Sequence, residues 1–203
     1  MAILRCPRCA LHQPLCLCDA IEPLDTATRV VVVVHGKEAA RTSNSGRLVP
    51  MTLRRGELHQ RDPRTGALDL DLADDDRRAV LLYPMATEVL APGPRRLTLV
   101  VPDGNWSQAR KMARRVPGLA ALPRVCLPPG EPSRFRLRSH PDPRRVSTFE
   151  AVARALGVLE GPEVEARLLE VFDRFVERTL WTRGDLPKAL VTGGIPDGGL
   201  TPR

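Results

Sequence analysis

Four of the five cysteines lie near the start of the chain, spaced as Cys-x-x-Cys and, six residues later, Cys-x-Cys: Cys6, Cys9, Cys16 and Cys18. Four thiolates in a short reduced segment are a typical ligand set for tetrahedral zinc. A redox pair, or cysteines with no shared role, are the alternatives. Zinc is favoured because free cysteines do not normally cluster in a proline-rich segment with few core residues. Since four thiolates leave no coordination position open, we predict a structural zinc that stiffens the N-terminal arm.

A second candidate site lies at residues 100–111, with the sequence VVPDGNWSQARK. Asp103 follows an apolar run and Pro102, and Trp106, one of only two tryptophans, comes three residues later. A carboxylate at the carboxyl end of a buried parallel strand lies where open α/β sheets bind their ligands. Alternatively, Asp103 caps the helix that follows and Trp106 packs under the turn. These residues alone slightly favour the cap, so the rest of the chain must decide.

The charge of the chain is a weaker indication of function. The net charge is +7, with 28 Arg and 3 Lys. Guanidinium groups bind phosphate oxygens in pairs, so this excess is consistent with a nucleic-acid partner. A GC-rich genome, which raises Arg, Ala, Gly and Pro together, accounts for most of the preference for Arg over Lys, so the excess of positive charge is the better indication. Lys37, Arg41 and Arg47 follow a predicted strand, in a polar loop where phosphate binding and an ordinary charged surface are equally compatible with the sequence.

Buried strands that alternate with helices must position these residues. Continuous apolar runs predict strands at 29–36, 78–84, 96–103 and 122–128. Helical patterns predict helices at 107–116, 147–157 and 162–180. Ser147 or Thr148 is the expected cap of the second helix, and Gly157 its expected end. Segment 54–78 is predicted to be turn-rich, and 85–93 a short helix or turn. The alternation indicates an α/β fold with a mainly parallel sheet and flanking helices.

Composition and spacing predict the organisation of the chain. We expect an N-terminal four-cysteine zinc-binding segment at 1–24, an α/β domain at 25–182 and a Gly/Pro-rich tail at 183–203. With 203 residues and 42% hydrophobics, the chain is long enough for one good core. It has no run of about 18 apolar residues and no signal-peptide pattern, so we expect no membrane span and a cytoplasmic location.

Five motifs occur along the chain in a fixed order. They are the N-terminal cysteines; His35-Gly36-Lys37-Glu38 with Ser43-Asn44-Ser45-Gly46-Arg47; Leu82-Tyr83-Pro84; Asp103-Gly104-Asn105-Trp106-Ser107-Gln108-Ala109; and Ser147-Thr148-Phe149-Glu150-Ala151. Together, from Cys6 to about Leu156, they resemble the DTW-domain family of tRNA-uridine aminocarboxypropyltransferases. The family is named for an Asp-x-Thr-Trp segment, and Ser-Thr-x-Glu-Ala is its later signature. Asn105 replaces the threonine, and Gly36 replaces a proline that is common after the histidine.

The resemblance implies a fold and a reaction. The fold is that of a SPOUT-like catalytic domain, with a C-terminal trefoil knot that holds S-adenosylmethionine. The reaction is transfer of the 3-amino-3-carboxypropyl group of S-adenosylmethionine to N3 of a tRNA uridine, with release of methylthioadenosine. Expected partners are therefore tRNA and S-adenosylmethionine. The sequence leaves open the tRNA, the uridine and the oligomeric state.

The resemblance also gives the candidate residues roles. Asp103 is the candidate base for the N3 proton. An unshifted aspartate, with a pKa of about 3.9, is poorly matched to a weakly acidic imide, so burial or concerted transfer is required. Trp106 would hold Asp103 in a dry pocket or stack on a base or adenine, with core packing as the alternative. The candidate cofactor-binding residues are Tyr83, Pro84, Asn105, Arg138, Ser147 and Thr148. The candidate RNA-binding residues are Lys37, Arg41 and Arg47.

Several alternatives stay open at this point. Ser147 and Thr148 are also explained as an ordinary helix cap, and Arg138 as a solvated arginine. Because Asn is polar but lacks the methyl of Thr, Asn105 is expected to affect substrate positioning or rate more than reaction type. One alternative function is a SPOUT-like RNA methyltransferase or a ribosomal RNA aminocarboxypropyltransferase. Another is a non-catalytic zinc-containing RNA-binding protein.

Overall fold

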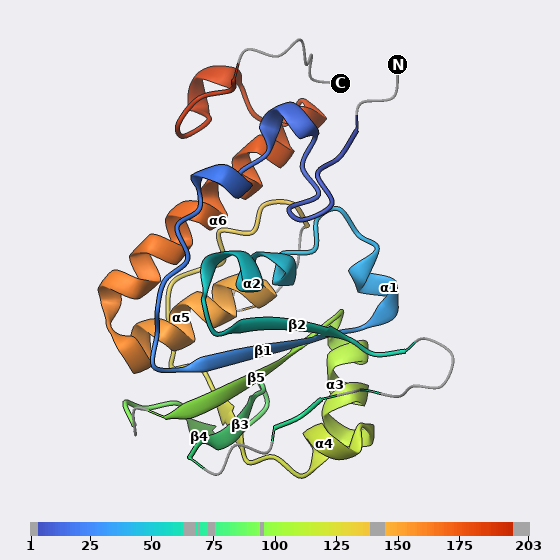
Figure 1. Cartoon of the computed structure of the whole chain (residues 1–203), viewed down its shortest axis with the longest axis vertical. Helices are drawn as coiled ribbons and strands as arrows, with labels where there is room; N and C mark the ends of the chain where they lie inside the picture. Colours follow the sequence, from blue (N-terminus) through green and yellow to red (C-terminus); the bar gives the residue numbers. More distant parts are fainter. Residues whose placement is uncertain are drawn as a thin grey trace.

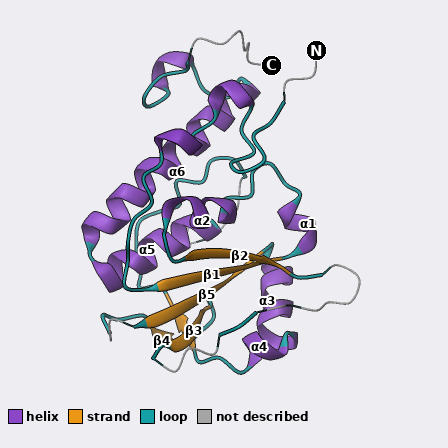
Figure 2. Ribbon diagram, in the orientation of Figure 1, coloured by secondary structure: helices purple, strands orange, loops and turns teal. Residues whose placement is uncertain are grey.

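The computed structural model describes residues 4–62, 68, 70–72, 76–93, 96–138 and 145–196. Within these residues a six-stranded sheet separates two groups of helices (Figures 1 and 2). The strands are β1 (Arg29–Val34), β2 (Gly56–Gln60), β3 (Arg78–Leu82), β4 (Glu88–Val89), β5 (Leu97–Asp103) and β6 (Arg124–Cys126). The α-helices are α1 (Gly36–Ala39), α2 (Val49–Thr52), α3 (Trp106–Arg115), α4 (Pro117–Ala120), α5 (Thr148–Glu160) and α6 (Pro162–Arg183). Short 3-10 turns are η1 (Gln13–Leu15), η2 (Cys18–Ala20), η3 (Gly46–Leu48) and η4 (Lys188–Leu190).

The sheet confirms the predicted mainly parallel α/β fold. Its strands lie in the order β2-β1-β5-β3-β6-β4, and every neighbouring pair is parallel. At the centre, β1 and β5 are aligned so that Val34 lies opposite Asp103. Both strands therefore end at the same edge of the sheet, and the residues that follow them meet there.

Alternate side chains of the central strands fill two separate cores. Val30 and Val32 of β1 point into the larger core, which α2, α5, α6 and the N-terminal segment cover. Val31 and Val33 point into the smaller core, which α3 and α4 cover on the opposite face. Burial on both faces explains why β1 is a continuous run of valines rather than an alternating pattern.

Two strands lie where the sequence predicted turns. β2 forms within the segment 54–78, at the edge of the sheet beside β1. Its residues, Gly-Glu-Leu-His-Gln, are partly or fully exposed, so it pairs through its backbone and has no apolar run to reveal it. β4 is a two-residue edge strand within 85–93, with both residues exposed. Edge position removed the hydrophobic signal of both strands, and β4 is also only two residues long.

Gly157 does not end α5 as predicted; the helix continues to Glu160. A Cβ atom at position 157 would lie 2.1 Å from a carboxylate oxygen of Glu165 on α6, so this glycine allows the two helices to pack closely. The helix ends at Gly161, whose φ of 114° is unfavourable for other residues. The other predicted helices are close to the observed ones, with α3 starting at Trp106 and α6 running on to Arg183.

The ends of the chain contribute to the larger core. Leu11, Leu15 and Leu17 of the cysteine segment are buried in it, as are Leu186 and Val191 beyond α6. The predicted trefoil knot depends on how the chain passes between β6 and α5, and residues 139–144 of that connection lie outside the described ones. The knot therefore stays a prediction. Among the described helices, none has both the length and the apolar character that crossing a membrane requires.

Candidate active site and metal centre

The two central strands lead to opposite faces of the sheet. After β1 the chain continues to η3 and α2, which pack in the larger core, whereas after β5 it continues to α3 and α4, which pack in the smaller one. Such a divergence between neighbouring parallel strands is the topological switch point at which open α/β sheets bind ligands. Asp103 is the last residue of β5 and lies at this point.

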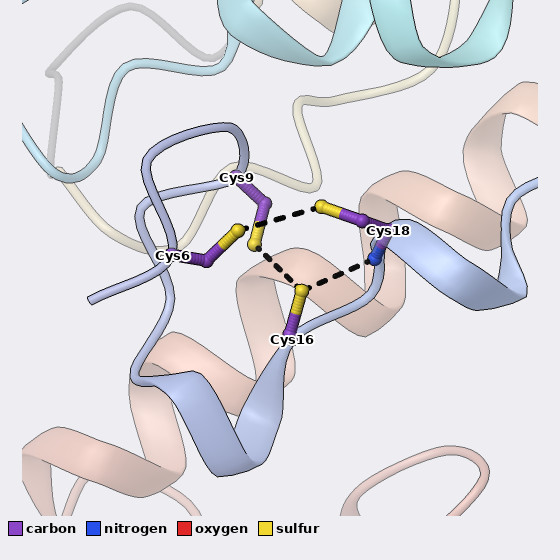
Figure 3. Close-up of side chains that lie close together, drawn as sticks. All are labelled: Cys6, Cys9, Cys16 and Cys18. Atoms are coloured by element: carbon purple, nitrogen blue, oxygen red, sulfur yellow. Dashed lines mark hydrogen bonds between the residues drawn. The ribbon is translucent and has the colours of Figure 1, made fainter. Parts of the chain in front are cut away.

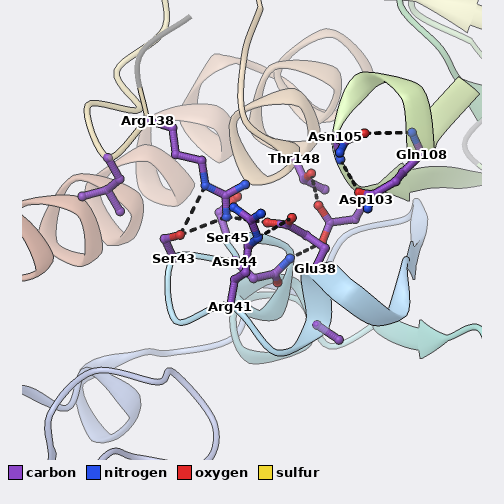
Figure 4. A network of polar contacts seen from close by, with 12 residues as sticks. Glu38, Arg41, Ser43, Asn44, Ser45, Asp103, Asn105, Gln108, Arg138 and Thr148 are labelled. Atoms are coloured by element: carbon purple, nitrogen blue, oxygen red, sulfur yellow. Dashed lines mark hydrogen bonds and ion pairs between the residues drawn. The ribbon is translucent and has the colours of Figure 1, made fainter. Parts of the chain in front are cut away.

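Asp103 is only 4% exposed, and side chains from two other segments hold its carboxylate (Figure 4). The Thr148 hydroxyl donates to Oδ1 of Asp103, and the side-chain amide of Asn44 donates to Oδ2. A Cβ atom at Gly46 would lie 2.7 Å from Oδ2, so only glycine lets η3 approach this closely. The carboxylate is thus packed and hydrogen-bonded by residues 59 and 45 positions away in sequence.

The surroundings of Asp103 make its carboxylate a stronger base than usual. Burial raises the pKa of Asp103 above its ordinary value, and the negative charge of Glu38 acts in the same direction. Hydrogen bonds from Thr148 and Asn44, and the positive charge of Arg138, oppose that rise in pKa. Asp103 is therefore a buried carboxylate with a raised pKa, which is the combination that general bases use.

The cap of α3 is Asn105, and this removes the alternative role of Asp103. The backbone N–H of Gln108 donates to the side-chain oxygen Oδ1 of Asn105 at 2.9 Å. The backbone N–H of Asn105 donates to the side-chain oxygen Oε1 of Gln108 at 2.8 Å. These two bonds form a complete capping box. Because threonine is also an effective N-cap residue, the Asn-for-Thr departure preserves the local function of this position. The Asn105 side-chain oxygen is used in the cap.

Trp106 belongs to neither of the two cores. It is the first residue of α3 and is 36% exposed. The Arg145 guanidinium lies 4.0 Å from the centre of its ring, in cation–π geometry. Core packing, the alternative weighed for this residue, is not what the structure shows, and a partly exposed ring is suited to stacking on a base.

The N-terminus of α5 combines a cap with a contact to Asp103. Ser147 is the N-cap, and its Oγ accepts from the Glu150 amide at 3.4 Å. The fully buried Glu150 completes the capping box and also accepts from Ser133 Oγ at 2.6 Å. The neighbouring Thr148 directs its hydroxyl to Asp103. Ser147 thus caps α5, and its predicted contact with a cofactor stays a prediction, while Thr148 contacts Asp103.

An ion-pair cluster centred on the buried Glu38 adjoins Asp103 (Figure 4). Glu38 is 4% exposed and pairs with Arg138, which also donates to Ser43 Oγ at 2.9 Å. Arg41 pairs with the second oxygen of Glu38 at 3.3 Å. Sequence reasoning found Arg138 and Arg41 but gave no role to Glu38, Ser43 or Asn44. Those three stood within the quoted motifs, but polar residues in a loop carry no sign that they will be buried.

The other predicted site residues have varied positions. Arg47 is turned inward, where it donates to the backbone oxygens of Ala39 and Arg41 at 3.1 and 3.0 Å. Lys37 is exposed on α1. Tyr83 packs in the smaller core with the Arg124 guanidinium 5.6 Å from its ring, and Pro84 is exposed. None of these four contacts the Asp103 carboxylate through a hydrogen bond in the described part of the chain.

The structure brings the four N-terminal cysteines together (Figure 3). All four sulfurs lie within 4.8 Å of one another, with Cys6 and Cys18 at 3.6 Å and Cys9 and Cys16 at 3.8 Å. In a tetrahedral site with Zn–S bonds of ~2.3 Å, neighbouring sulfurs are about 3.8 Å apart. The arrangement can therefore hold a metal ion. Cys126, in β6, is not part of it.

The surroundings act differently on the individual thiols, because burial raises the pKa of Cys9 and of Cys18 whereas the pKa of Cys6 is lowered. Burial opposes ionisation of Cys6, but backbone amides of Cys9 and Arg8 and the nearby thiols outweigh it and lower its pKa to about 7. Arg178 of α6 is buried and donates to the backbone oxygens of Leu15 and Cys16 at 2.9 and 3.2 Å. This arginine fastens the cysteine segment to α6 and places a positive charge beside it.

Comparison with known proteins agrees with this arrangement. The DTW domain matches residues 3–180, a range that takes in both the cysteine cluster and the Asp103 centre. A Drosophila melanogaster protein named tRNA-uridine aminocarboxypropyltransferase 2 is 28% identical over 81% of this chain and 70% of its own length. A Mus musculus protein of the same name is 29% identical over 76% of this chain and 56% of its own length. No solved structure matches the chain at a comparable level.

Proposed function

This chain belongs to the DTW domain family, and we propose that it is a tRNA-uridine aminocarboxypropyltransferase that uses S-adenosylmethionine as donor. The observation that carries the proposal is the buried Asp103 carboxylate at the switch point, held by groups from two other family motifs. The names of the similar fly and mouse proteins support the same reaction.

In the proposed reaction, N3 of a tRNA uridine attacks the γ-carbon of the methionine part of S-adenosylmethionine. The carbon–sulfur bond breaks, its electron pair passes to sulfur, and methylthioadenosine leaves. The N3 proton passes to Asp103. Each carboxylate oxygen has two lone pairs and accepts one side-chain hydrogen bond here, so either oxygen can still accept the substrate proton. The raised pKa of Asp103 favours this transfer.

Arg138 is our candidate for the carboxylate of the transferred group. Its side chain is 34% exposed, and Glu38 and Ser43 fix its guanidinium. Its positive charge also acts on Asp103, where it partly offsets the rise in pKa that burial causes. A guanidinium anchored on one side offers its remaining N–H groups to a carboxylate. We assign Trp106 to stacking on a base of the RNA or on the adenine of the donor.

We further propose that the cysteine cluster holds one structural zinc ion. The sulfur–sulfur distances fit tetrahedral zinc, and four thiolates would leave no position for substrate. The metal would stabilise the N-terminal segment, which packs on α6 through Arg178. In this assignment the zinc takes no part in the chemical step.

Product analysis tests the function directly. The purified protein is incubated with S-adenosylmethionine and an unmodified tRNA transcript, and both products are identified by mass spectrometry. We expect 3-(3-amino-3-carboxypropyl)uridine and methylthioadenosine in equal amounts. A methylated nucleoside with S-adenosylhomocysteine would instead identify a methyltransferase. Absence of S-adenosylmethionine binding would favour an RNA-binding protein without catalysis.

A further inference from the structure

The exposed face of α3 carries four cations: Arg110, Lys111, Arg114 and Arg115. The helix, WSQARKMARR, contains no acidic residue. Across the described parts of the chain, none of these four side chains forms an ion pair or a hydrogen bond. Their charges are therefore directed to solvent.

Of the three cations predicted from the sequence to bind RNA, Lys37 is exposed, but the two arginines are placed differently. Arg41 pairs with the buried Glu38, and Arg47 donates to backbone oxygens of its own loop. Both side chains hold the loop 36–47 in place beside Asp103. Of the two segments that flank Asp103, α3 is the one with a row of uncommitted arginines.

The spacing of the α3 residues arranges them in two rows. Trp106, Arg110 and Arg114 are each four residues apart and lie on one side of the helix. Ser107, Lys111 and Arg115 form the neighbouring row. The buried residues of the helix, Met112 among them, face the smaller core. The first row starts at the exposed Trp106, only three residues from Asp103, and runs roughly 12 Å along the helix.

Helix stability alone does not account for this arrangement. Like charges four residues apart destabilise a helix by about 0.2–0.5 kcal/mol per pair. Positive charges suit the last turn of a helix, where Arg114 and Arg115 lie, because of the helix dipole. Arg110 and Lys111 lie in the middle of α3 and gain little from the dipole. Four clustered cations without acidic partners are the electrostatic pattern of a surface that meets a polyanion.

We propose that this face of α3 is the docking surface for the phosphate backbone of the tRNA substrate. The two rows of cations contact successive phosphates and lead the strand to Trp106, and the target base then reaches Asp103. This inference rests on the proposed function for the identity of the RNA, but the surface itself is tested by binding alone. Each phosphate contact contributes about 0.7–0.9 to the slope of log affinity against log salt concentration.

A matched pair of double variants tests the surface. Arg110→Gln/Arg114→Gln removes two charges from α3. Arg54→Gln/Arg167→Gln removes two exposed charges elsewhere: Arg54 just before the start of β2, and Arg167 on α6, which lies 3.8 Å from Glu22 in an exposed ion pair. Affinity for an unmodified tRNA transcript is measured at several salt concentrations. The α3 variant should have a slope shallower by roughly 1.4–1.8, and the control should stay close to the wild type.

The outcomes separate the surface from the reaction. An unchanged slope in the α3 variant, or equal losses in both variants, would overturn the docking surface even if the wild type forms the expected nucleoside. A shallower slope only in the α3 variant would support the surface even if no nucleoside forms, and would then count against the reaction. A wild type that does not bind tRNA overturns both. Should thermal unfolding show that the α3 variant is misfolded, Lys111→Gln/Arg115→Gln gives the same test on the second row.

Discussion

The cysteine cluster and the Asp103 centre are both shielded polar sites, but they are assembled over very different lengths of chain. The cysteine ligands lie within 13 consecutive residues, in a segment with its own turns η1 and η2. The Asp103 centre joins the end of β5 to a loop 59 residues earlier and a helix 45 residues later. One site is local, and the other depends on the whole sheet.

This difference has consequences for stability and for function. In the local site, four neighbouring thiols favour metal binding and would repel one another as thiolates without it. In the long-range site, a carboxylate is kept buried by hydrogen bonds and by close packing against Gly46. Damage to the first is therefore expected to appear as loss of metal and of stability. Damage to the second is expected to appear mainly as loss of the chemical step.

The largest effect on stability is expected from Cys16→Ser. Structural zinc contributes about 10–16 kcal/mol of apparent binding free energy in isolated finger peptides, so loss of one ligand should release the metal and lower the melting temperature markedly. Elemental analysis and thermal unfolding measure the two effects. Cys126→Ser is the matched control, because Cys126 lies outside the cluster and should leave the metal content unchanged. Wild-type zinc content and melting temperature in Cys16→Ser would refute the metal site.

A smaller effect is expected from Gly46→Ala. The new Cβ atom would lie 2.7 Å from the Asp103 carboxylate, so η3 or the carboxylate must move, at a cost of about 1–3 kcal/mol. Turnover should fall, whereas zinc content should stay at the wild-type value. Gly118→Ala is the control, since a Cβ atom there meets nothing within 4 Å. Equal turnover in both variants would show that the close approach of η3 to Asp103 has no importance.

The raised pKa of Asp103 predicts that the free energy of unfolding depends on pH through this group. The native state binds the Asp103 proton more tightly than the unfolded state, so stability from this group is present at low pH and is lost as pH rises through the native pKa. Asp103→Asn removes the ionisable group and with it this loss of stability. The oxygen of the new side-chain amide can accept from Asn44, and its NH₂ group can donate to the Thr148 hydroxyl. The variant should therefore be more stable than the wild type at neutral pH, with the difference shrinking in acid. Urea unfolding at several pH values measures it, and a difference that grows in acid would contradict the assigned shift.

The smallest effects are expected at Asn105. Asn105→Ala removes the α3 cap and should cost about 1 kcal/mol. Asn105→Thr restores the family residue, keeps a capping oxygen and should change stability by only a few tenths of a kcal/mol. Thermal unfolding and turnover of the two variants are compared. If Thr behaves like Ala, Asn105 does more than cap the helix.

The contrast between the two sites also explains what could be predicted from the sequence. The cysteine cluster was predicted from spacing alone because its geometry is local. β1, β3 and β5 were predicted because burial on both faces produces continuous apolar runs. The place of Asp103 at the end of such a run left a ligand site and a helix cap open, and the family resemblance decided between them. Of its two hydrogen-bond partners, Thr148 was a candidate and Asn44 was not.

The rest depends on contacts between distant segments. Glu38 and Asn44 are buried only because loop 36–47, β5 and α5 meet, and no local pattern marks a polar loop residue as buried. Gly157 was predicted to end a helix because its real constraint, the approach of Glu165 from α6, is not encoded in its neighbours. The inward turn of Arg47, and the solvent-facing α3 cations, likewise follow from tertiary structure rather than from charge counting.

The most direct test of the account is the turnover of Asp103→Asn with S-adenosylmethionine and unmodified tRNA. The substitution keeps the shape of the side chain and removes the base, and a positioned general base typically contributes 10²–10⁴-fold. We expect formation of 3-(3-amino-3-carboxypropyl)uridine to fall by at least about 100-fold, while S-adenosylmethionine affinity and zinc content stay at wild-type values. Wild-type turnover in Asp103→Asn would contradict the assignment of Asp103 as the base and with it the proposed mechanism.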